Sequence, residues 1–407
     1  MQRFVPNLRH LRAFTEVADS KSISAASKKI YLSQPAITQA INKLEELVRS
    51  PLFTRSSNGM FPTEAGELFL VRVERCLNLL EAGTRESLRL GLRKGGKLPA
   101  SVEHLISTTQ LRALIAVADA RNFTLAAQKI GISQPSLHRA ARELENLLQI
   151  SLFEKTSQGI GLSRAAQVLA QTAKLCFAEI KQGFEEVDAL HGWDSGSITV
   201  GSMPLARTYL LPCSINELTR VHPDTRISVV EGPYEDLLNH LRHGEIDMLI
   251  GALRDPLPTD DIVQTELFAT PLAIVARCGH PLSDKKSISI NELAKYPWVV
   301  PRPGTPTREH FESMFKEAGV PVPANLNESS SLILVRGLLL DSDRLTIISA
   351  HQILHEERMG LLEALPVEMG HTRRPIGLTT RRDWKPTKTQ QLFIDLLKSK
   401  AEAMSGQ

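Results

Sequence analysis

Polar side chains suited to contacts with a nucleic acid recur in this sequence at a constant spacing of 100 residues. The run Ser33-Gln34-Pro35 returns as Ser133-Gln134-Pro135, and Arg55 is matched by Lys155. Glutamine, asparagine and arginine can form paired hydrogen bonds with purine edges, whereas arginine and lysine suit phosphate groups. The spacing therefore predicts base and phosphate contacts that the chain presents twice. For a single side chain such as Gln34, a solvated helix face is the alternative.

The repeat extends over a whole domain. Residues 11–66 align with residues 111–166 without a gap, and about 21 of the 56 positions are identical. A fixed period of this length with only two copies indicates a duplicated domain rather than a solenoid. We name residues 11–66 the first copy and residues 111–166 the second copy.

Each copy has the pattern of three helices followed by a hairpin. Apolar residues recur at helical spacing from Leu8 to Ala18, and Ser33 and Ser133 are suited to cap a third helix that has proline in its first turn. Helix, turn, helix and hairpin is the order of a DNA-binding motif. In the first copy we predict a second helix at about 24–30, a turn at 31–32, the third helix from 33 and a hairpin at 51–62, with the same elements 100 residues later in the second copy.

Both copies resemble the winged helix-turn-helix of LysR-type transcriptional regulators. The segments that carry the resemblance are AFTEVADSKSISAASKKIYLSQPAITQAINKLEELVRSPLFTRSSNGMFPTEAG and ALIAVADARNFTLAAQKIGISQPSLHRAARELENLLQISLFEKTSQGIGLSRAA. The resemblance implies that the third helix enters the major groove and that the hairpin, called the wing, holds the flanking backbone. The implied DNA contacts are Gln34, Pro35, Thr38, Gln39, Asn42 and Arg55 in the first copy, and Gln134, Pro135, His138, Arg139, Arg142 and Lys155 in the second.

The two copies differ where they would contact bases. The first copy has Gln39 at a position where members of the family commonly carry a basic residue, whereas the second copy has Arg139. Residues 1–100 hold sixteen basic and nine acidic side chains, and residues 101–192 hold nine of each. We therefore expect the copies to prefer different sequences or to bind with different strength. The alternative is that only one copy contacts DNA and the other is a structural oligomerisation module.

A long helix is predicted after each hairpin. Thr63 and Ser163 are suited to cap it, and small or apolar residues follow at 65, 69, 73, 76 and 80 and again 100 residues later. In the family, such linker helices pair antiparallel between two chains. Here the connection 91–107 is long enough for both helices of one chain to pair, which predicts an intramolecular pseudo-dimer in which Cys76 and Cys176 approach one another. Two cysteines filling separate gaps in the core are the alternative.

The composition is that of a folded protein without a membrane anchor. With 407 residues, of which 42% are hydrophobic and 23% charged, the chain can form two or three domains with cores of their own. No segment resembles a signal peptide or stays apolar over about 18 residues, so we expect a cytoplasmic protein. The four cysteines lie far apart, which predicts reduced and mostly buried thiols.

After residue 193 the pattern changes to short β-branched runs separated by helices. This alternation predicts a mostly parallel, doubly wound α/β arrangement. Residues 196–400 resemble the LysR effector domain, which has the two-lobed fold of type 2 periplasmic binding proteins; the lobes would be 196–269 with the C-terminal return, and 270–365. The predicted strands are 197–201, 226–231, 247–251, 272–276, 298–301, 345–349 and 376–380, and the predicted helices are 208–220, 234–243, 306–318, 331–340 and 386–403.

The same resemblance implies an inducer site in the cleft between the lobes. Arg302, beside Gly304-Thr305, could bind a carboxylate or phosphate, or form an ion pair between the lobes. The expected inducer is an organic acid or a sugar derivative. The candidate site residues lie at strand ends and helix starts: Ser202, Met203, Pro204, Glu231, Gly251, Pro271, Arg302, Thr305 and Ser329.

Other functional classes find little support. The chain has no P-loop, no GxSxG and no GxGxxG after a predicted strand, so an enzyme is not expected. His351 and His355 could hold a metal ion, but their spacing equally suits the surface of a helix, which we favour. A transport binding protein would share the effector fold but would need an export signal and no DNA-binding units.

We therefore predict a transcriptional regulator without cofactor or metal. Its expected partners are double-stranded promoter DNA, a small-molecule inducer, RNA polymerase and a second copy of the chain. A homodimer would present four winged units and two effector domains. The predicted domains are 1–90, the first winged unit with its linker helix; 91–107, a connector; 108–192, the second winged unit with its linker helix; and 193–407, the effector domain.

Overall fold

The chain divides into two compact units. The computed structural model describes residues 5–92, 101–157, 159–193, 196–370, 372 and 374–405, apart from the side chains of Lys155 and Ser405. The first unit holds residues up to 197 together with 242–245, and the second holds 198–241 together with 246–407. Residues 93–100 of the predicted connector 91–107 lie outside the described residues.

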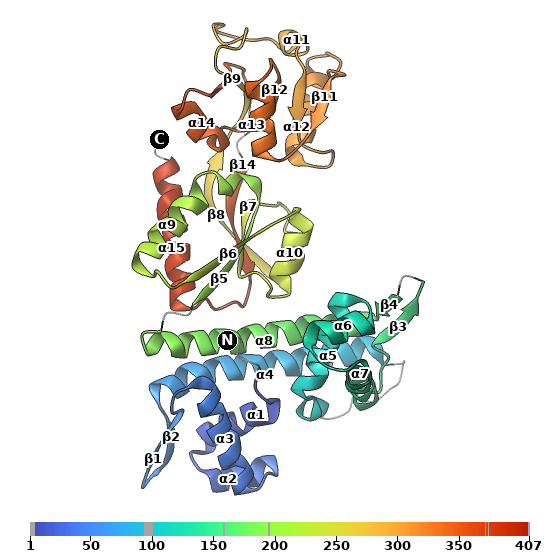
Figure 1. Ribbon diagram of the computed structural model, residues 1–407, viewed down its shortest axis with the longest axis vertical. Coiled ribbons are helices and arrows are strands. Elements are labelled where there is room, and N and C mark those ends of the chain that lie inside the picture. Colours follow the sequence, from blue (N-terminus) through green and yellow to red (C-terminus); the bar gives the residue numbers. More distant parts are fainter. Residues whose placement is uncertain are drawn as a thin grey trace. The chain divides into compact units, whose positions relative to one another are not determined.

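The first unit contains the same order of elements twice (Figure 1). Three helices, a two-stranded antiparallel hairpin and a long helix follow one another in each copy, and the third helix, the hairpin and the long helix begin where the sequence predicts. The first series is α1 (Leu8–Ser20), α2 (Ile23–Ile30), α3 (Gln34–Val48), β1 (Phe53–Ser56), β2 (Gly59–Pro62) and α4 (Glu64–Gly91); the second is α5 (Thr108–Ala120), α6 (Phe123–Ile130), α7 (Gln134–Leu148), β3 (Phe153–Thr156), β4 (Gly159–Leu162) and α8 (Arg164–Leu190).

Hydroxyl side chains start the helices as predicted. The Ser33 hydroxyl accepts the backbone N–H of Ala36 at 3.4 Å, and Ser133 caps α7 in the same way. Thr63 and Ser163 accept from the third residue of α4 and α8 at 3.0 and 3.2 Å. Each cap satisfies an amide that has no partner within its own helix, which fixes where the helix begins.

The hairpin of each copy is held against the turn that follows the first helix. The backbone N–H of Met60 donates to the Lys21 carbonyl at 2.9 Å, and Ile160 donates to Arg121 at 3.0 Å. Gly59, at a φ of 131°, lies so close that a Cβ there would be 2.6 Å from the Lys21 carbonyl oxygen. Glycine at this position therefore lets the hairpin dock on the helical part of the copy.

The two long helices of the first unit, α4 and α8, pack side by side and antiparallel (Figure 1). The start of α4 lies against the end of α8, since Phe69 stacks on Phe184 with ring centroids 5.5 Å apart. The end of α4 lies against the start of α8, where the Ser87 hydroxyl donates to the Ala165 carbonyl at 2.9 Å. All ten residues of the predicted seam are buried: Ala65, Phe69, Val73, Cys76 and Leu80, and Ala165, Leu169, Ala173, Cys176 and Ile180.

The two cysteines meet near the middle of this helix pair, as predicted. The Cys176 thiol donates to the Cys76 backbone carbonyl at 3.1 Å, and both residues are fully buried. The contact between equivalent residues of the two copies indicates a pseudo-twofold axis through the centre of the pair. Burial, together with the neighbouring Cys76, raises the pKa of the Cys176 thiol well above its usual value.

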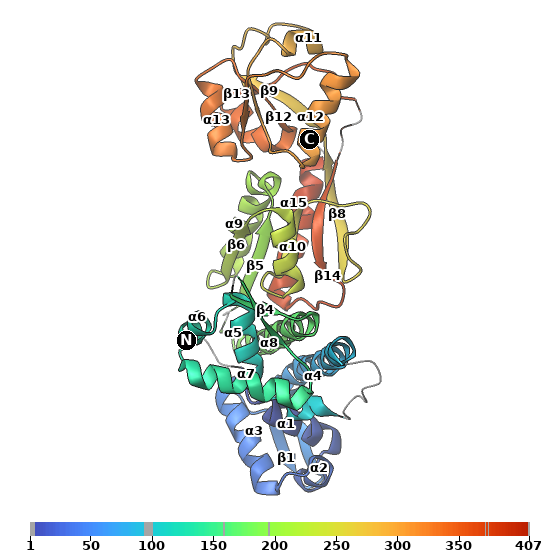
Figure 2. The same cartoon turned by 90° about the vertical axis from the view of Figure 1, so that its right-hand side faces the viewer.

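The second unit contains two five-stranded sheets (Figure 2). In the first lobe the order is β6-β5-β7-β14-β8, formed by β5 (Ser197–Ser202), β6 (Arg226–Glu231), β7 (Met248–Ala252), β8 (Ile262–Thr270) and β14 (Arg374–Arg381). In the second lobe the order is β11-β10-β12-β9-β13, formed by β9 (Leu272–Arg277), β10 (Trp298–Val300), β11 (Leu326–Glu328), β12 (Leu345–Ser349) and β13 (Leu362–Ala364).

Helices cover these sheets at the predicted places. They are α9 (Leu210–Val221), α10 (Tyr234–Arg242), α12 (Pro306–Glu317), α13 (Leu332–Leu340) and α15 (Lys388–Ser405), with the shorter α11 (Ile290–Leu293) and α14 (Leu354–Arg358). Two one-turn helices, η2 (Pro204–Arg207) and η3 (Ala350–Ile353), follow β5 and β12. Among the described residues, no helix is both long and apolar enough to cross a membrane.

The expectation of mostly parallel sheets was wrong, because both sheets are mixed. β5 pairs with β7 in parallel and β10 with β11 and β12, but β14 runs antiparallel to β7 and β8, and β9 runs antiparallel to β12 and β13. The antiparallel pairs arise because the chain leaves one sheet through β8, enters the other at β9 and returns through β14. The sequence pattern also missed β8, β11 and β13, of which β11 and β13 have only three residues each.

Close contact between α4 and α8 makes Gly83 a critical position for stability. A Cβ at Gly83 would lie 2.0 Å from the Thr172 hydroxyl oxygen and 2.7 Å from the Thr172 Cβ. Gly83→Ala should therefore lower the free energy of unfolding of the first unit by about 1–2 kcal/mol, because a clash of about 3 kcal/mol outweighs the roughly 1 kcal/mol gained in helix propensity. Differential scanning calorimetry measures the change.

Gly337→Ala is the matched control, since Gly337 lies within α13 and a Cβ there would meet nothing within 4 Å. This variant should be stabilised by up to about 1 kcal/mol. Equal stabilisation of the two variants would contradict close packing at Gly83.

Candidate nucleic-acid interface and effector site

The start and one face of α3 present the residues predicted to contact DNA in the first copy. Gln34, Pro35, Gln39 and Asn42 are exposed or half-exposed, whereas Ile37, Ala40, Ile41 and Leu44 of the same helix are buried in the core. The Thr38 hydroxyl donates to the Gln34 carbonyl at 3.0 Å. The helix therefore offers a polar face of amide side chains, which can bond to base edges without carrying charge.

The equivalent face of α7 has different chemistry and more internal contacts. Arg139 is exposed, and no ion pair links it to another described residue. The Gln134 side-chain carbonyl accepts the Thr124 hydroxyl at 3.2 Å, and the His138 ring packs on Phe123 with centroids 5.0 Å apart. Arg142 pairs with Glu145 at 2.6 Å. Of the predicted charged contacts on α7, Arg139 is thus the one with freedom to reach a base.

A glutamate near the end of each third helix fixes the hairpin that follows. Glu45 accepts the backbone N–H of Leu52 at 2.8 Å and that of Phe53 at 3.4 Å. Glu145 accepts from the equivalent amides at 2.8 and 3.1 Å. These glutamates were missed as functional residues, although the identical pairs Leu44-Glu45 and Leu144-Glu145 were visible in the repeat. They position the hairpin relative to the helix that would enter the groove.

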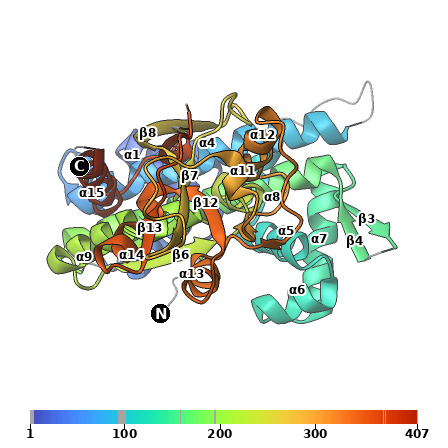
Figure 3. The ribbon, with the colours of Figure 1, turned by 90° about the horizontal axis from the view of Figure 1, so that it is seen from above.

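The hairpins carry the predicted phosphate contacts. Arg55 is exposed on β1, in register with Met60 on β2. Lys155 occupies the equivalent place on β3, in register with Ile160, and its side chain lies outside the described residues. In Figure 3 the second hairpin, β3 and β4, extends beyond α7 in the same group of elements as α5 and α6.

Each long helix reaches the opposite copy. His191, just beyond α8, has its Nε2 2.9 Å from the Ser50 hydroxyl at the end of α3. Gly91, the last residue of α4, lies so close to Ile150, which follows α7, that a Cβ there would be 2.9 Å from it. Ser50 and Ile150 are equivalent positions, so the two copies are joined by matching contacts, and the end of α4 lies beside the second copy as predicted.

In the first lobe of the second unit, the predicted effector residues cluster at the carboxyl ends of the strands. Ser202 is buried at the end of β5, and the backbone N–H of Met203 donates to the Ile250 carbonyl at 3.0 Å. Gly251 allows this contact, because a Cβ there would lie 2.4 Å from the Met203 sulfur. Glu231, at the end of β6, forms an ion pair with Arg207 of η2. Pro204 begins η2, and Pro271 joins β8 to β9.

The predicted residues of the second lobe cluster where β10 ends. Thr305 caps α12, accepting the backbone N–H of Arg308, and its hydroxyl donates to the Arg302 carbonyl at 3.0 Å. The backbone N–H of Ser329 donates to the Val300 carbonyl at 2.9 Å. Arg302 is exposed, and none of the ion pairs found among the described residues includes it. The interlobe ion pair considered for Arg302 is therefore not present there.

One cationic side chain that the sequence pattern did not indicate, Arg374, connects the two lobes. Arg374, at the start of β14, donates to the Thr307 hydroxyl at 3.1 Å. Burial and then the nearby positive charge of Arg254 lower the pKa of Arg374. Burial and then Arg374 lower the pKa of His310 on α12. Arg254 and Arg374 thus lie close enough for their charges to repel one another, while Glu309 acts on Arg374 in the opposite direction.

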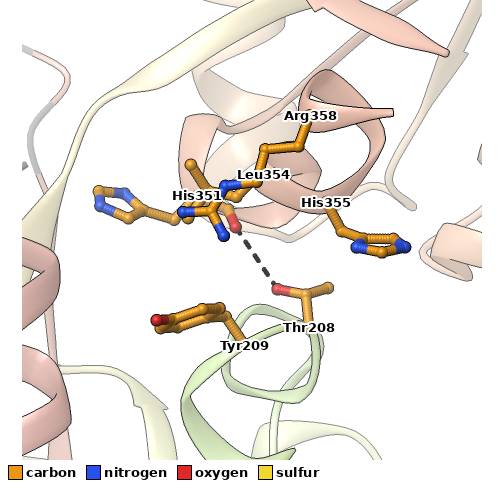
Figure 4. A pocket seen from close by; sticks show the side chains of 6 residues that line it. All are labelled: Thr208, Tyr209, His351, Leu354, His355 and Arg358. Carbon is orange, nitrogen blue, oxygen red and sulfur yellow. Dashed lines mark hydrogen bonds between the residues drawn. The ribbon is translucent and has the colours of Figure 1, made fainter. Parts of the chain in front are cut away.

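A small pocket lies where η2 and α9 of the first lobe face η3 and α14 of the second (Figure 4). It has a volume of about 140 Å³, and the Thr208 hydroxyl donates to the His351 carbonyl at 3.5 Å across it. Arg358 extends from α14 toward Tyr209, while His355 lies apart from them. None of the nine predicted effector residues lines this pocket, whose walls are Thr208, Tyr209, His351, Leu354, His355 and Arg358.

The two histidines considered as metal ligands both line this pocket, but their rings point to opposite sides of it (Figure 4). His351 lies in η3 and is half-buried, and its Nδ1 lies 2.7 Å from the Thr270 hydroxyl. His355 is exposed on α14. No group of three or more potential metal ligands occurs within the part of the chain that the structure describes.

Comparisons with known proteins decide the family. A family profile described as "LysR substrate binding domain" matches residues 191–402, and one described as "Bacterial regulatory helix-turn-helix protein, lysR family" matches residues 8–67 and again 108–167. The chain belongs to the LysR family of transcriptional regulators. It is a DNA-binding regulator with a C-terminal effector-binding domain, and the relatives it matches are regulators rather than enzymes.

Individual relatives of this LysR-family regulator support the same family assignment. The HTH-type transcriptional regulator GalR of Pseudomonas putida is 34% identical over 377 residues, which cover 93% of each chain. PcaQ of Agrobacterium fabrum is 27% identical over 74% of this chain and 96% of its own length. The fold is also similar to a full-length OxyR variant from Pseudomonas aeruginosa (22% identity, TM-score 0.54, 72% and 94% coverage) and to CbnR solved with its target DNA (20% identity, TM-score 0.50, 72% and 99% coverage).

The glutamate contacts to the hairpin predict a specific pattern of stability changes. Glu145→Ala leaves the amides of Leu152 and Phe153 without their acceptor, and should cost about 1–3 kcal/mol of unfolding free energy. Glu145→Gln keeps a carbonyl acceptor at the same place and should lose clearly less, although it removes the partner of Arg142. Urea unfolding of both variants measures the difference. Equal losses would show that the amide contacts do not hold the hairpin.

Proposed function

We propose that both copies are winged helix-turn-helix units, and that one chain contacts two adjacent DNA half-sites through α3 and α7. The observation that carries the proposal is the antiparallel α4–α8 pair, which joins the two copies by matching contacts within one chain. The double match to the helix-turn-helix profile supports it, as do the exposed polar faces of α3 and α7. The proposed domains are 1–90, 91–107, 108–192 and 193–407.

The two units would favour different base sequences. Gln39 and Asn42 on α3 offer amides that suit adenine, whereas Arg139 on α7 offers a guanidinium that suits guanine. Arg55 and Lys155 on the wings would hold phosphates on either side. Because the copies are joined in a fixed relation, the operator of one chain would be an unequal pair of half-sites rather than a palindrome.

Footprinting on the DNA upstream of its own coding sequence tests this proposal. Asn42→Ala and Arg139→Ala should each weaken protection of a different half-site, by about 10-fold to 100-fold in affinity, because each removes a paired base contact worth roughly 1–3 kcal/mol. Arg55→Ala and Lys155→Ala should weaken binding and lower the salt dependence by about one phosphate contact each.

Arg85→Ala is the matched control for these variants. Arg85 is exposed on α4 and pairs with Glu81 of its own helix at 2.6 Å, so its loss should leave both half-sites protected. If Arg139→Ala and Lys155→Ala change neither half-site, the second copy is a structural module, which is the other candidate function.

We further propose that the effector is a small organic acid bound between the lobes near Arg254 and Arg374. Strands β5 and β7 bring Ser202, Met203 and Gly251 to the sheet edge from which Arg254 follows, and Thr307, bonded to Arg374, lies two residues after Thr305. A carboxylate there would relieve the repulsion between the arginines. Binding would shift the balance between lobe arrangements and so alter promoter contacts, including contacts with RNA polymerase.

A thermal-shift screen with a panel of carboxylates tests the effector class. An acid that stabilises the wild-type chain should lose its effect in Arg374→Ala, because the variant removes one of the two cations. The same acid should keep its effect in Arg358→Ala, whose side chain belongs to the small pocket of Figure 4. The reverse pattern would place the effector in that small pocket instead.

We also propose that the chain associates with a second copy of itself. LysR-family regulators act as oligomers, and the simplest assembly for this chain is a homodimer. With α4 already paired to α8, the second chain would join through the effector domains. Such a dimer would carry four DNA-binding units and two effector domains, and would act in the cytoplasm, where its DNA lies.

A further inference from the structure

The α4–α8 interface has two unequal ends, although the helices are copies of one another. The contact between Cys76 and Cys176 places the pseudo-twofold axis at the centre of the pair. A residue of α4 on one side of this axis is therefore equivalent to the residue 100 positions later in α8, on the other side. A symmetric interface between two identical helices would have identical ends. A difference between the two ends therefore reflects sequence differences between α4 and α8.

One end is held by a buried charge network around Arg72. The guanidinium donates to both carboxylate oxygens of Glu186, at 2.5 and 3.0 Å, so that the pair is bidentate. It also donates to Glu179 at 3.0 Å and to the Gln182 side-chain carbonyl at 2.9 Å. The Arg72 and Glu179 side chains are only 3% and 8% exposed. Arg75 adds a second cation to Glu179 at 2.8 Å.

Arg72 stays charged in this buried position. Burial alone would lower the pKa of Arg72, but hydrogen bonds and charge from Glu186 and then Glu179 outweigh it, so that the pKa is raised. A buried ion pair contributes little when compared with apolar packing, yet removing one partner is strongly destabilising. The main effect of such a network is therefore to destabilise pairing with any helix that lacks the matching groups.

The other end of the interface has no equivalent network among the described residues. The position equivalent to Arg72 is Thr172, which packs on Gly83. The positions equivalent to Glu179 and Gln182 are Leu79 and Ala82, so one carboxylate and one amide are replaced by apolar side chains. Glu86, equivalent to Glu186, pairs with Arg89 of its own helix instead. Packing of small and apolar groups thus replaces the charges of the first end.

Pairing of like helices would misplace these groups twice. In an α4–α4 pair, each Arg72 would face Leu79, Ala82 and Glu86, so it would keep a glutamate in place of Glu186 but lose Glu179 and Gln182. In an α8–α8 pair, Glu179 and Gln182 would face Thr172 and lose their arginine. Because the mismatch occurs at both ends of a symmetric pair, both arrangements leave buried polar groups without some of the partners that they have in the α4–α8 pair.

We propose that Arg72, Glu179, Gln182 and Glu186 form a pairing selector that restricts α4 to α8 and excludes a second α4 as its partner. The selector also excludes linker helices of other regulators that lack the same acceptors. It ensures that the two DNA-binding faces in every pair are the unlike ones, α3 and α7. The inference does not depend on which copy contacts DNA.

A single-cysteine reporter in the full-length chain tests the selector. Replacing Cys176, Cys213 and Cys278 by serine leaves Cys76, which would meet its counterpart only in an α4–α4 pair. An exchange of α8 between two chains would not bring these thiols together, so the reporter separates the two events. Copper-phenanthroline oxidation, followed by denaturing electrophoresis, measures the rate at which disulfide-linked dimers form.

Arg72→Thr, the residue that the second copy has at this position, should raise this rate at least tenfold over the reporter chain. The triple change Arg72→Thr, Glu179→Leu, Gln182→Ala makes the selector positions of both ends alike and leaves no buried charge of the selector without a partner except Glu186. It should keep a cooperative thermal transition and should also cross-link at least tenfold faster than the reporter chain. The triple variant therefore tests the proposal even if Arg72→Thr alone does not fold.

Arg85→Thr is the matched control, because it removes an arginine of α4 that contacts Glu81 on its own helix. It should cross-link at the rate of the reporter chain. Two outcomes would overturn the proposal: rapid cross-linking of the reporter chain with its selector intact, or a folded triple variant that cross-links no faster than that chain.

Discussion

The antiparallel packing of α4 against α8 is the interaction on which the first unit depends. Each long helix has an apolar seam that would be exposed to water without the other helix. Each helix also packs against both its own copy and the opposite copy. One apolar cluster runs from Leu8 and Phe14 of the first copy through both helices to Leu148 and Leu152 of the second. The helix pair thereby sets the relation between α3 and α7 before any DNA or second chain is bound.

Much of this arrangement follows from residue types at fixed spacing. The gapless offset of 100 residues, the hydroxyl caps Ser33 and Thr63 and the seam from Ala65 to Leu80 predict the elements and the meeting of Cys76 with Cys176. The sequence could not show the selector, because Arg72 and Glu179 look like ordinary exposed charges on a helix. Only the packing shows that they are buried and joined across 107 positions.

In the second unit, β-branched runs located the longer strands but not their directions. Whether β14 runs parallel to β7 depends on where the chain crosses between lobes, which is a long-range choice that local patterns do not encode. The cationic side chains Arg254 and Arg374 were missed for the same reason, since they are far apart in sequence and come near one another only when β14 returns. The places of Met203 and Gly251 at strand ends were predicted correctly, because position along a strand is a local property.

The most direct test of the account is whether α4 and α8 pair within one chain. Unlabelled and ¹⁵N-labelled chains would be mixed, unfolded and refolded together, and then treated with a short thiol cross-linker for long enough to reach the buried Cys76 and Cys176. Mass spectrometry of the linked peptides identifies the chain of origin. The account predicts Cys76–Cys176 links in which both peptides are light or both are heavy, whereas abundant light–heavy links would show pairing between chains and contradict it.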